Sequence, residues 1–416
     1  MEAFVTPRPP DHIAQLRTQA TLLVLGASAF QVPAILQARR LGCRVVVCDH
    51  TPQNPGHRLA DTSVTVSTTD FEGVLALARA QGADGVLAYA SDPAALTAAR
   101  VAEVLGLPGS PADAVATLTD KPRFRQFLHA NGFRAPHCVG VQTAAAARVA
   151  LREVGLPAMV KPADSSGSKG VGQITDADDV ATAFDAAQAW SRSGEVVIES
   201  WIRREGAQVA GDGLVVDGRL VFGGFGDEHF DPVCSPFAPV GESYPGTLAP
   251  ERRVRLIAAL ERLFGLLGVR DLVFNLDAAF TDDGEPILLE VGPRAGGNAL
   301  PQLIALHTGV DLTDIAIRQA LGLGVSPSAW AGAPSGCFAS HILHARRPGV
   351  FCGVRIDPEL HDHLVDFELT VKPGRTVAPF GSSADTLGFG LFRFPDVRTM
   401  ALRLSCIADH FSPVLA

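Results

Sequence analysis

Short apolar runs alternate with helical patterns in the first quarter of the chain. The apolar runs cover residues 21–25, 44–48, 64–66 and 85–90, and helical patterns cover residues 26–41 and 71–80. Strands that alternate with helices form a parallel sheet with helices on both faces. We therefore predict an open α/β domain over residues 21–118, preceded by an N-terminal extension over residues 1–20.

The pattern changes after residue 118. Helices are predicted near residues 122–131, 180–189, 250–267 and 312–321, strands at 158–161 and 196–199, and tight turns at 217–218 and 281–284. Residues 326–335 are rich in Pro, Gly, Ser and Ala, which is typical of a linker. We predict a second domain over residues 119–325 and a small β-rich α+β domain over residues 336–416.

Composition excludes several classes of protein. The net charge is −9 and no basic stripe is present, which argues against a nucleic-acid partner. No apolar run reaches the roughly 18 residues that a membrane span needs, and residues 1–20 lack an apolar signal core. The seven cysteines form no CxxC pair, so we expect scattered reduced thiols. These features predict a cytoplasmic protein that contacts no membrane.

Lysine is nearly absent, yet three of the four lysines lie close together in the sequence. They are Lys121 in Asp-Lys-Pro, Lys161 in Val-Lys-Pro, and Lys169 in a Ser/Gly loop; Lys372 is the fourth. A compact ammonium suits a narrow phosphate pocket better than a guanidinium does. The loop consists of Ser165, Ser166, Gly167, Ser168, Lys169 and Gly170, whose small residues let backbone N–H groups approach phosphate oxygens. The alternative interpretation is that lysine is scarce throughout the chain for a general reason and that the Ser/Gly loop is an ordinary turn.

A second group of residues lies on the predicted hairpin around residues 281–284. Asp277 is on its first strand and Glu290 on its second, so both carboxylates can face one point. Oxygen ligands at that point suit a Mg²⁺ ion that bridges nucleotide phosphates, although solvated strand faces remain the alternative. Arg294 follows between a proline and glycines and could contact a phosphoryl group.

In this order, the motifs resemble the ATP-grasp superfamily over residues 20–325, in the branch of biotin carboxylase, carbamoyl-phosphate synthase and carboxylate–amine ligases. The resemblance implies an α/β fold class, with a parallel-sheet pre-ATP-grasp domain before a two-lobed α+β ATP-grasp domain. It implies that Lys121 and Lys161 contact the phosphates of ATP and that the loop at residues 165–170 closes over them. Glu199, Trp201 and Ile202 match the hinge that reads adenine.

The resemblance also implies that Asp277 and Glu290 bind Mg²⁺, or Mn²⁺, and that Arg294 and Lys161 act in catalysis. Two positions depart from the family pattern. Gly292 stands where the family has a metal-binding Asn, so Asn298 is the candidate replacement. Gln208 stands where an acidic residue binds ribose, with Glu205 nearby as the alternative.

The expected activity is that of an ATP- and Mg²⁺-dependent ligase. It would activate a small carboxylic acid as an acyl phosphate and join it to an amine, with release of ADP and phosphate. The alternatives are a bicarbonate-activating carboxylase or carbamoyl-phosphate synthase-like enzyme, and a non-catalytic nucleotide-binding protein. The expected partners are the acid and the amine, with a homodimer as a further possibility.

Overall fold

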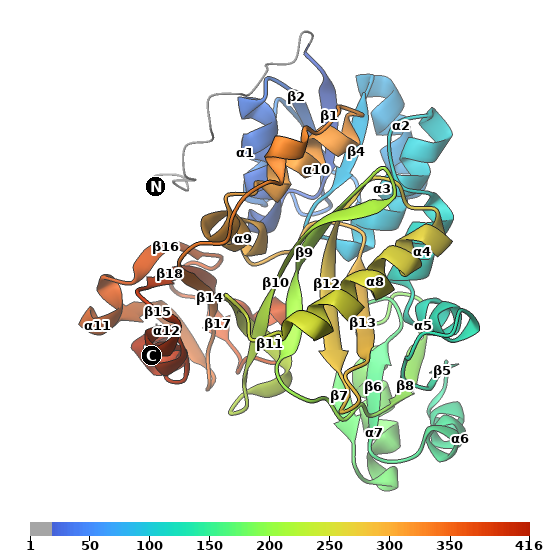
Figure 1. Ribbon diagram of the computed structural model, residues 1–416, viewed down its shortest axis with the longest axis vertical. Helices are drawn as coiled ribbons and strands as arrows, with labels where there is room; N and C mark the ends of the chain where they lie inside the picture. The colour runs from blue at the N-terminus through green and yellow to red at the C-terminus, as the bar shows by residue number, and fades with distance from the viewer. Residues whose placement is uncertain (1–18) are drawn as a thin grey trace.

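The computed structural model describes residues 19–416, so nearly all of the predicted N-terminal extension lies outside the described residues. The chain begins with a four-stranded parallel sheet in the order β3-β2-β1-β4 (Figure 1). Its elements are β1 (Thr21–Leu25), α1 (Val32–Arg40), β2 (Arg44–Cys48), β3 (Thr62–Val64), α2 (Phe71–Gln81), β4 (Gly85–Ala88) and α3 (Asp92–Leu105). Successive side chains of a strand point to opposite faces. Leu22 and Val24 therefore pack with α1, while Leu23 and Leu25 pack with α2 and α3.

A second, antiparallel sheet follows in the order β5-β8-β6-β7. Helix α4 (Ala112–Thr119) packs on α3 of the first domain and leads into this small lobe. The elements after it are α5 (Lys121–Ala130), β5 (Cys138–Val141), α6 (Ala144–Val154), β6 (Ala158–Pro162), β7 (Gly172–Ile174), α7 (Val180–Gln188) and β8 (Val196–Ser200). Val160 and Ile198 face α6 and α7 in one apolar core. Because strand side chains alternate, Lys161 and Glu199 face away from those helices.

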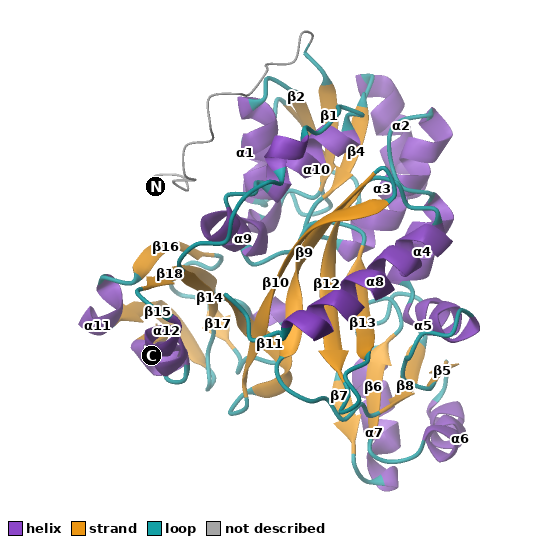
Figure 2. Ribbon diagram, in the orientation of Figure 1, coloured by secondary structure: helices purple, strands orange, loops and turns teal. Residues whose placement is uncertain are grey.

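The largest sheet has eight strands in the order β13-β12-β9-β10-β11-β14-β18-β16 (Figure 2). Residues 200–325 supply β9 (Gln208–Val216), β10 (Arg219–Asp231), β11 (Ser235–Tyr244), α8 (Pro250–Leu267), β12 (Leu272–Phe280), β13 (Pro286–Gly292), α9 (Leu300–Thr308) and α10 (Leu312–Ala320). Helix α8 covers one face, where Phe274 and Leu276 join its apolar residues in one core. The neighbouring residues on β12, Asn275 and Asp277, therefore face the other side.

The C-terminal residues 336–416 continue this same sheet. They form β14 (Cys337–Leu343), β15 (Gly349–Ile356), α11 (Pro358–His361), β16 (Leu364–Leu369), β17 (Thr376–Val377), β18 (Gly388–Phe394), α12 (Val397–Leu404), α13 (Ile407–His410) and β19 (Phe411–Leu415). Tyr244 on β11 pairs with Phe338 on β14, while β17, β15 and β19 form a separate small sheet. The region is mainly β, as expected, but its sheet is continuous with that of the preceding domain.

Several predicted elements agree with the structure, whereas some helices of the structure were not predicted. The helix over residues 250–267 and the turns at 217–218 and 281–284 lie where the sequence placed them. The alanine-rich helices α3 and α6, and α9, were not predicted. Helix α10 returns to the first domain, where Thr313 hydrogen-bonds the hydroxyl of Tyr89 at 2.8 Å. Tyr89 and Thr313 are far apart in the sequence, so no local sequence pattern predicts this contact.

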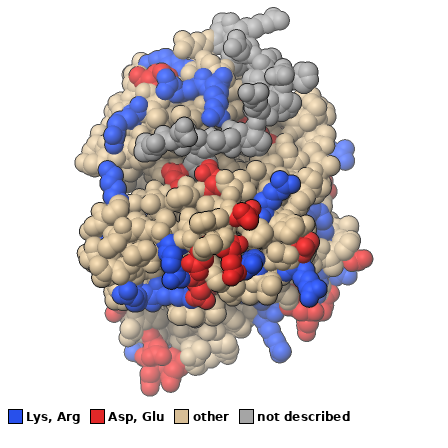
Figure 3. Space-filling model, turned by 90° about the vertical axis from the view of Figure 1, so that its left-hand side faces the viewer, with Lys and Arg blue, Asp and Glu red and all other residues tan. Residues whose placement is uncertain are grey.

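The structure also describes the cysteines, the apolar length of the helices and the distribution of surface charge. All seven cysteines lie within the described residues and are free thiols. Among residues 19–416, no helix is long and apolar enough to cross a bilayer. On the face drawn in Figure 3, the described basic side chains are interspersed with acidic ones rather than joined in one patch.

Candidate active site

The small lobe and the large sheet enclose a cavity of about 180 Å³. Most of the residues that the sequence singled out line it: Lys121, Lys161, Ser165, Ser166, Gly167, Ser168, Lys169, Glu199, Trp201, Ile202, Gln208, Asp277 and Glu290. These residues come from α5, β6, the Ser/Gly loop, β8, β9 and the β12–β13 hairpin. The fold therefore brings together two lysines, a loop of small residues and two carboxylates that are far apart in the sequence.

The two predicted metal ligands are direct neighbours across the hairpin. Asp277 on β12 pairs in register with Glu290 on β13, so both carboxylates lie on the cavity face. Burial, followed by the charge of Glu290, raises the pKa of Asp277 to about 8. The Nζ of Lys121 is 4.0 Å from Glu290. Two adjacent carboxylates that repel each other form an oxygen donor set that fits Mg²⁺, which would relieve the repulsion.

This repulsion predicts a pH dependence for the metal-free protein. Folded Asp277 has a pKa of about 8, against an ordinary value of 3.8. Between these values the folded state holds a proton that the unfolded state has lost, so the free energy of unfolding falls as pH rises. We expect Asp277→Asn to reduce this fall, and Mg²⁺ to offset it in the unmodified protein. Urea unfolding at several pH values across this window measures both effects; equal pH slopes in the two proteins would contradict the assignment.

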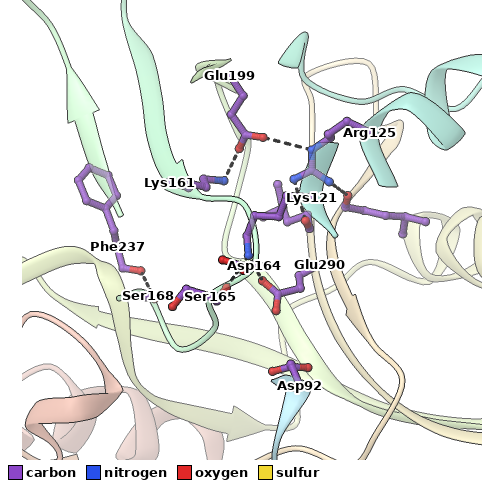
Figure 4. Close-up of polar contacts among 12 residues, drawn as sticks. Asp92, Lys121, Arg125, Lys161, Asp164, Ser165, Ser168, Glu199, Phe237 and Glu290 are labelled. Carbon is purple, nitrogen blue, oxygen red and sulfur yellow. Dashed lines mark hydrogen bonds and ion pairs between the residues drawn. The ribbon is translucent and has the colours of Figure 1, made fainter. Parts of the chain in front are cut away.

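The lysines are held by different partners. Lys121 donates to the backbone carbonyl of Ser165 at 2.6 Å, which ties α5 to the Ser/Gly loop. Lys161 forms an ion pair with Glu199, as Figure 4 shows. Both ammonium groups lie within the lining of the cavity.

Glu199 has a structural role that the sequence did not reveal. Its carboxylate is 2% exposed, and it contacts Arg125 as well as Lys161 (Figure 4). Burial alone would raise the pKa of Glu199, but Lys161 and Arg125 outweigh it and hold that pKa at about 2. Its neighbours Trp201 and Ile202 line the cavity, and the Trp201 ring lies edge-on to Phe237 at 6.3 Å.

Arg125 on α5 is the residue that local sequence reasoning missed most completely. Its side chain is 1% exposed and donates to Glu199 at 3.2 Å. It also donates to the carbonyls of Leu288 and Leu289 on β13, at 3.4 and 2.8 Å. One guanidinium thus joins the strand of Glu199 to the strand of Glu290. Arg125 shares the buried face of α5 with Phe124 and Leu128, and its place next to Phe124 in the sequence is the local signal for it.

The Ser/Gly loop touches two distant parts of the chain. The hydroxyl of Ser168 donates to the carbonyl of Phe237 at 2.9 Å, and the amide of Ser383 donates to the carbonyl of Gly167 at 2.9 Å. Gly167 has φ of +67°, and an added Cβ would lie 2.1 Å from the Ser383 hydroxyl. Gly170 lies at the end of the loop and packs against Trp190 rather than lining the cavity.

Arg294 lies beside the cavity rather than in its lining. Its guanidinium contacts the carboxylate of Asp92 at 2.5 Å, and both side chains are largely buried. Asp92 begins α3 and lines a second cavity of about 530 Å³. The two cavities share Lys121, Ser165 and Glu290. Asp92 was not predicted, although the helix-start pattern Ser-Asp-Pro was available in the sequence.

The two uncertain positions have clear locations. Gln208 lines the first cavity and donates to Glu228 at 2.5 Å, whereas Glu205 pairs with Arg252 at 2.7 Å and does not line it. Asn298 precedes α9 with φ of +51° and is not part of the cavity lining. Of these three residues, Gln208 alone belongs to the cavity lining.

Comparisons with known proteins agree with this architecture. The sequence model described as the ATP-grasp N-terminal domain matches residues 35–109. The model described as the carbamoyl-phosphate synthase L chain, ATP binding domain, matches residues 120–208. Over these two segments the chain is similar to ATP-grasp proteins. The solved L-amino acid ligase of Bacillus licheniformis has the same fold, with a TM-score of 0.79 at 20% identity over 96% of this chain and 100% of that chain.

Curated relatives match this chain over part of their own length. An uncharacterised protein of Sinorhizobium fredii is 29% identical over 70% of this chain and 60% of its own length. The carbamoyl phosphate synthase large chain of Vibrio cholerae is 28% identical over 70% of this chain and 27% of its own length. This chain therefore spans less than two thirds of either relative.

Proposed function

We propose that this protein is an ATP- and Mg²⁺-dependent ligase that joins a small carboxylic acid to an amine. The observation that carries the proposal is the single cavity in which Asp277 and Glu290 face Lys121, Lys161 and the Ser/Gly loop. Carboxylates beside ammonium groups fit a Mg²⁺-nucleotide, because the cation and the phosphates each find an opposite charge. The family relationship and the fold of an L-amino acid ligase support the same activity.

The chain's own groups would act by positioning and charge neutralisation. Trp201 and Ile202 would hold adenine at the hinge, and Gln208 would contact ribose. Lys121 and Lys161 would bind phosphate oxygens, and the loop at residues 165–170 would exclude water from the acyl phosphate. Mg²⁺, held by Asp277 and Glu290, would neutralise charge on the transferred phosphoryl group. The amine would then attack the acyl carbon and release phosphate.

The second cavity gives the acid and the amine a place beside the nucleotide. It adjoins the first through Lys121, Ser165 and Glu290, and Asp92 lies in its wall. Arg294, which contacts Asp92 beside this junction, would steady the acyl phosphate. An acid in the second cavity would thus reach the phosphoryl group without leaving the protein.

We expect Lys161→Ala and Arg294→Ala to have different effects. Lys161 lines the nucleotide cavity, so its loss should weaken ATP binding. Arg294 lies outside that lining, so Arg294→Ala should retain ATP affinity and lower the rate of turnover. Titration of each variant with ATP, followed by the rate of ADP release, separates the two roles. Equal losses of ATP affinity would contradict the division.

The activity itself is tested by an ADP- and phosphate-release screen of pooled acids against pooled amines, with mass spectrometry of the products. The expected result is an amide product and ADP only when an acid and an amine are both present. AMP and pyrophosphate as products would reject the acyl-phosphate route. ATP binding without turnover in every pool would favour a non-catalytic nucleotide-binding protein.

A bicarbonate-activating enzyme is the second candidate, because the Vibrio cholerae relative is a carbamoyl phosphate synthase large chain. The discriminating arm of the screen supplies bicarbonate with ammonia, or bicarbonate alone. ADP release in that arm, without any organic acid, would favour this candidate over the carboxylate–amine ligase.

A further inference from the structure

Three potential metal ligands meet away from the nucleotide cavity. Asp231 is the last residue of β10, Cys234 lies in the turn before β11, and His344 follows β14. The carboxylate oxygen, the thiol sulfur and a ring nitrogen lie within 4.8 Å of one another. Asp231 and His344 are each 4% exposed, and Cys234 is partly buried. Asp231 and Cys234 are close in the sequence, but His344 is 113 residues from Asp231. The sequence places His341 near His344 but gives that pair no further ligand, so the tertiary structure alone assembles this group.

Both ring nitrogens of His344 have a hydrogen-bonding partner. Its Nδ1 is 2.7 Å from the carbonyl oxygen of Ile342, which can only accept, so Nδ1 carries a proton. Its Nε2 is 2.9 Å from a carboxylate oxygen of Asp231. A bare nitrogen and a carboxylate would repel each other at this distance, so either a proton or a metal ion joins them. A backbone carbonyl on Nδ1 is also the usual partner of a metal-binding histidine.

A neighbouring histidine provides an independent sign of a ligand. His341 is 3% exposed, and its ring lies 5.4 Å from that of His344. Within the described residues, its Nε2 has no hydrogen-bond partner. Buried ring nitrogens normally have a protein, water or ion partner, so this nitrogen calls for a hydrogen-bonding partner.

We propose that Asp231, Cys234 and His344 bind a Zn²⁺ ion, with water in the fourth position. Sulfur, imidazole and carboxylate donors together suit this borderline-soft ion, which prefers four ligands. A zinc-bound water would supply the hydrogen-bonding partner that His341 Nε2 lacks. Arg346 donates to Asp231 at 2.6 Å and contacts Asp409 at 2.7 Å, which orients the carboxylate from outside the metal shell.

The site would connect the turn between β10 and β11 to β14. Strand β11, which follows this turn, carries Phe237, whose carbonyl accepts a hydrogen bond from the hydroxyl of Ser168 in the Ser/Gly loop. Zn²⁺ would thus fix the surface on which this loop rests. The ion would be structural, and its binding does not depend on the ligase activity proposed above.

Cobalt is the probe for the test, because Co²⁺ bound to a thiolate gives a charge-transfer band that oxygen ligands do not give. The apo protein, without nucleotide, is titrated with Co²⁺ and then with Zn²⁺. We expect one equivalent of Co²⁺, a thiolate band, and displacement of the band by Zn²⁺. Asp277 and Glu290 offer no sulfur, so binding there would leave this band absent.

Variants assign the band to the proposed ligands. Cys234→Ser and His344→Asn should lose it, while Cys352→Ser, which removes an exposed thiol, should keep it. A thiolate band that persists in Cys234→Ser would overturn the proposal. So would the absence of a band in the unmodified protein, which would identify an imidazolium–carboxylate ion pair instead. Because the unmodified protein alone can give this second result, the test does not depend on the variants folding.

Discussion

Asp277→Asn should keep the fold and lower ATP turnover by about a hundredfold or more, the scale of losing one preorganised electrostatic group. The amide preserves the size of the side chain but removes the charge that would hold Mg²⁺ beside Glu290. Glu290→Gln should act in the same direction. We also expect both variants to need more Mg²⁺ for ATP binding, which calorimetric titration of ATP at increasing Mg²⁺ concentrations measures.

The control for this prediction lies on the same hairpin. Asp282 is exposed in the turn between β12 and β13, so Asp282→Asn removes one carboxylate of the same type without touching the cavity. It should leave the Mg²⁺ requirement unchanged. If Asp277→Asn and Asp282→Asn gave the same Mg²⁺ dependence, the hairpin would not be the metal site.

Arg125→Met should lower the free energy of unfolding by about 3–5 kcal/mol, the range for removing one partner of a buried ion pair. The loss leaves the 2%-exposed carboxylate of Glu199 with Lys161 as its remaining charged partner, and it frees the carbonyls of Leu288 and Leu289. Because Lys161 must then compensate Glu199 alone, ATP affinity should fall as well. Urea unfolding and ATP titration measure the two effects.

Helix α5 supplies a matched control. Arg123 is on the same helix and pairs with Asp113, but the two side chains are 42% and 88% exposed. Arg123→Met should therefore cost less than about 1 kcal/mol. Adding Glu199→Gln to Arg125→Met should recover part of the lost stability, since the uncompensated charge is gone. Similar losses from Arg123→Met and Arg125→Met would show that Arg125 is not a buried structural link.

The sequence predicted those residues of the candidate site that lie together in short segments of the chain. Lys161, the Ser/Gly loop and the pair of Asp277 and Glu290 could be found because a strand, a loop or a hairpin places each of them locally. Asp92 and Arg125 could not be found in this way. Their partners, Arg294 and Glu199, are respectively 202 and 74 residues away in the sequence.

The sequence by itself determined the local elements of this protein and the kinds of chemical groups on them. Alternating apolar runs specify strands, and a Thr-Asp-Asp-Gly turn joins β12 to β13. A shift in register between Asp277 and Ala278 then pairs Asp277 with Glu290, which the turn alone does not specify. The positions of these elements relative to one another depend on the tertiary structure alone. It joined the C-terminal strands to the large sheet, buried Arg125 between two strands, and brought Asp231 and Cys234 to His344. The physical reason is that burial and ion pairing depend on contacts between distant segments, which periodicity along the chain does not record.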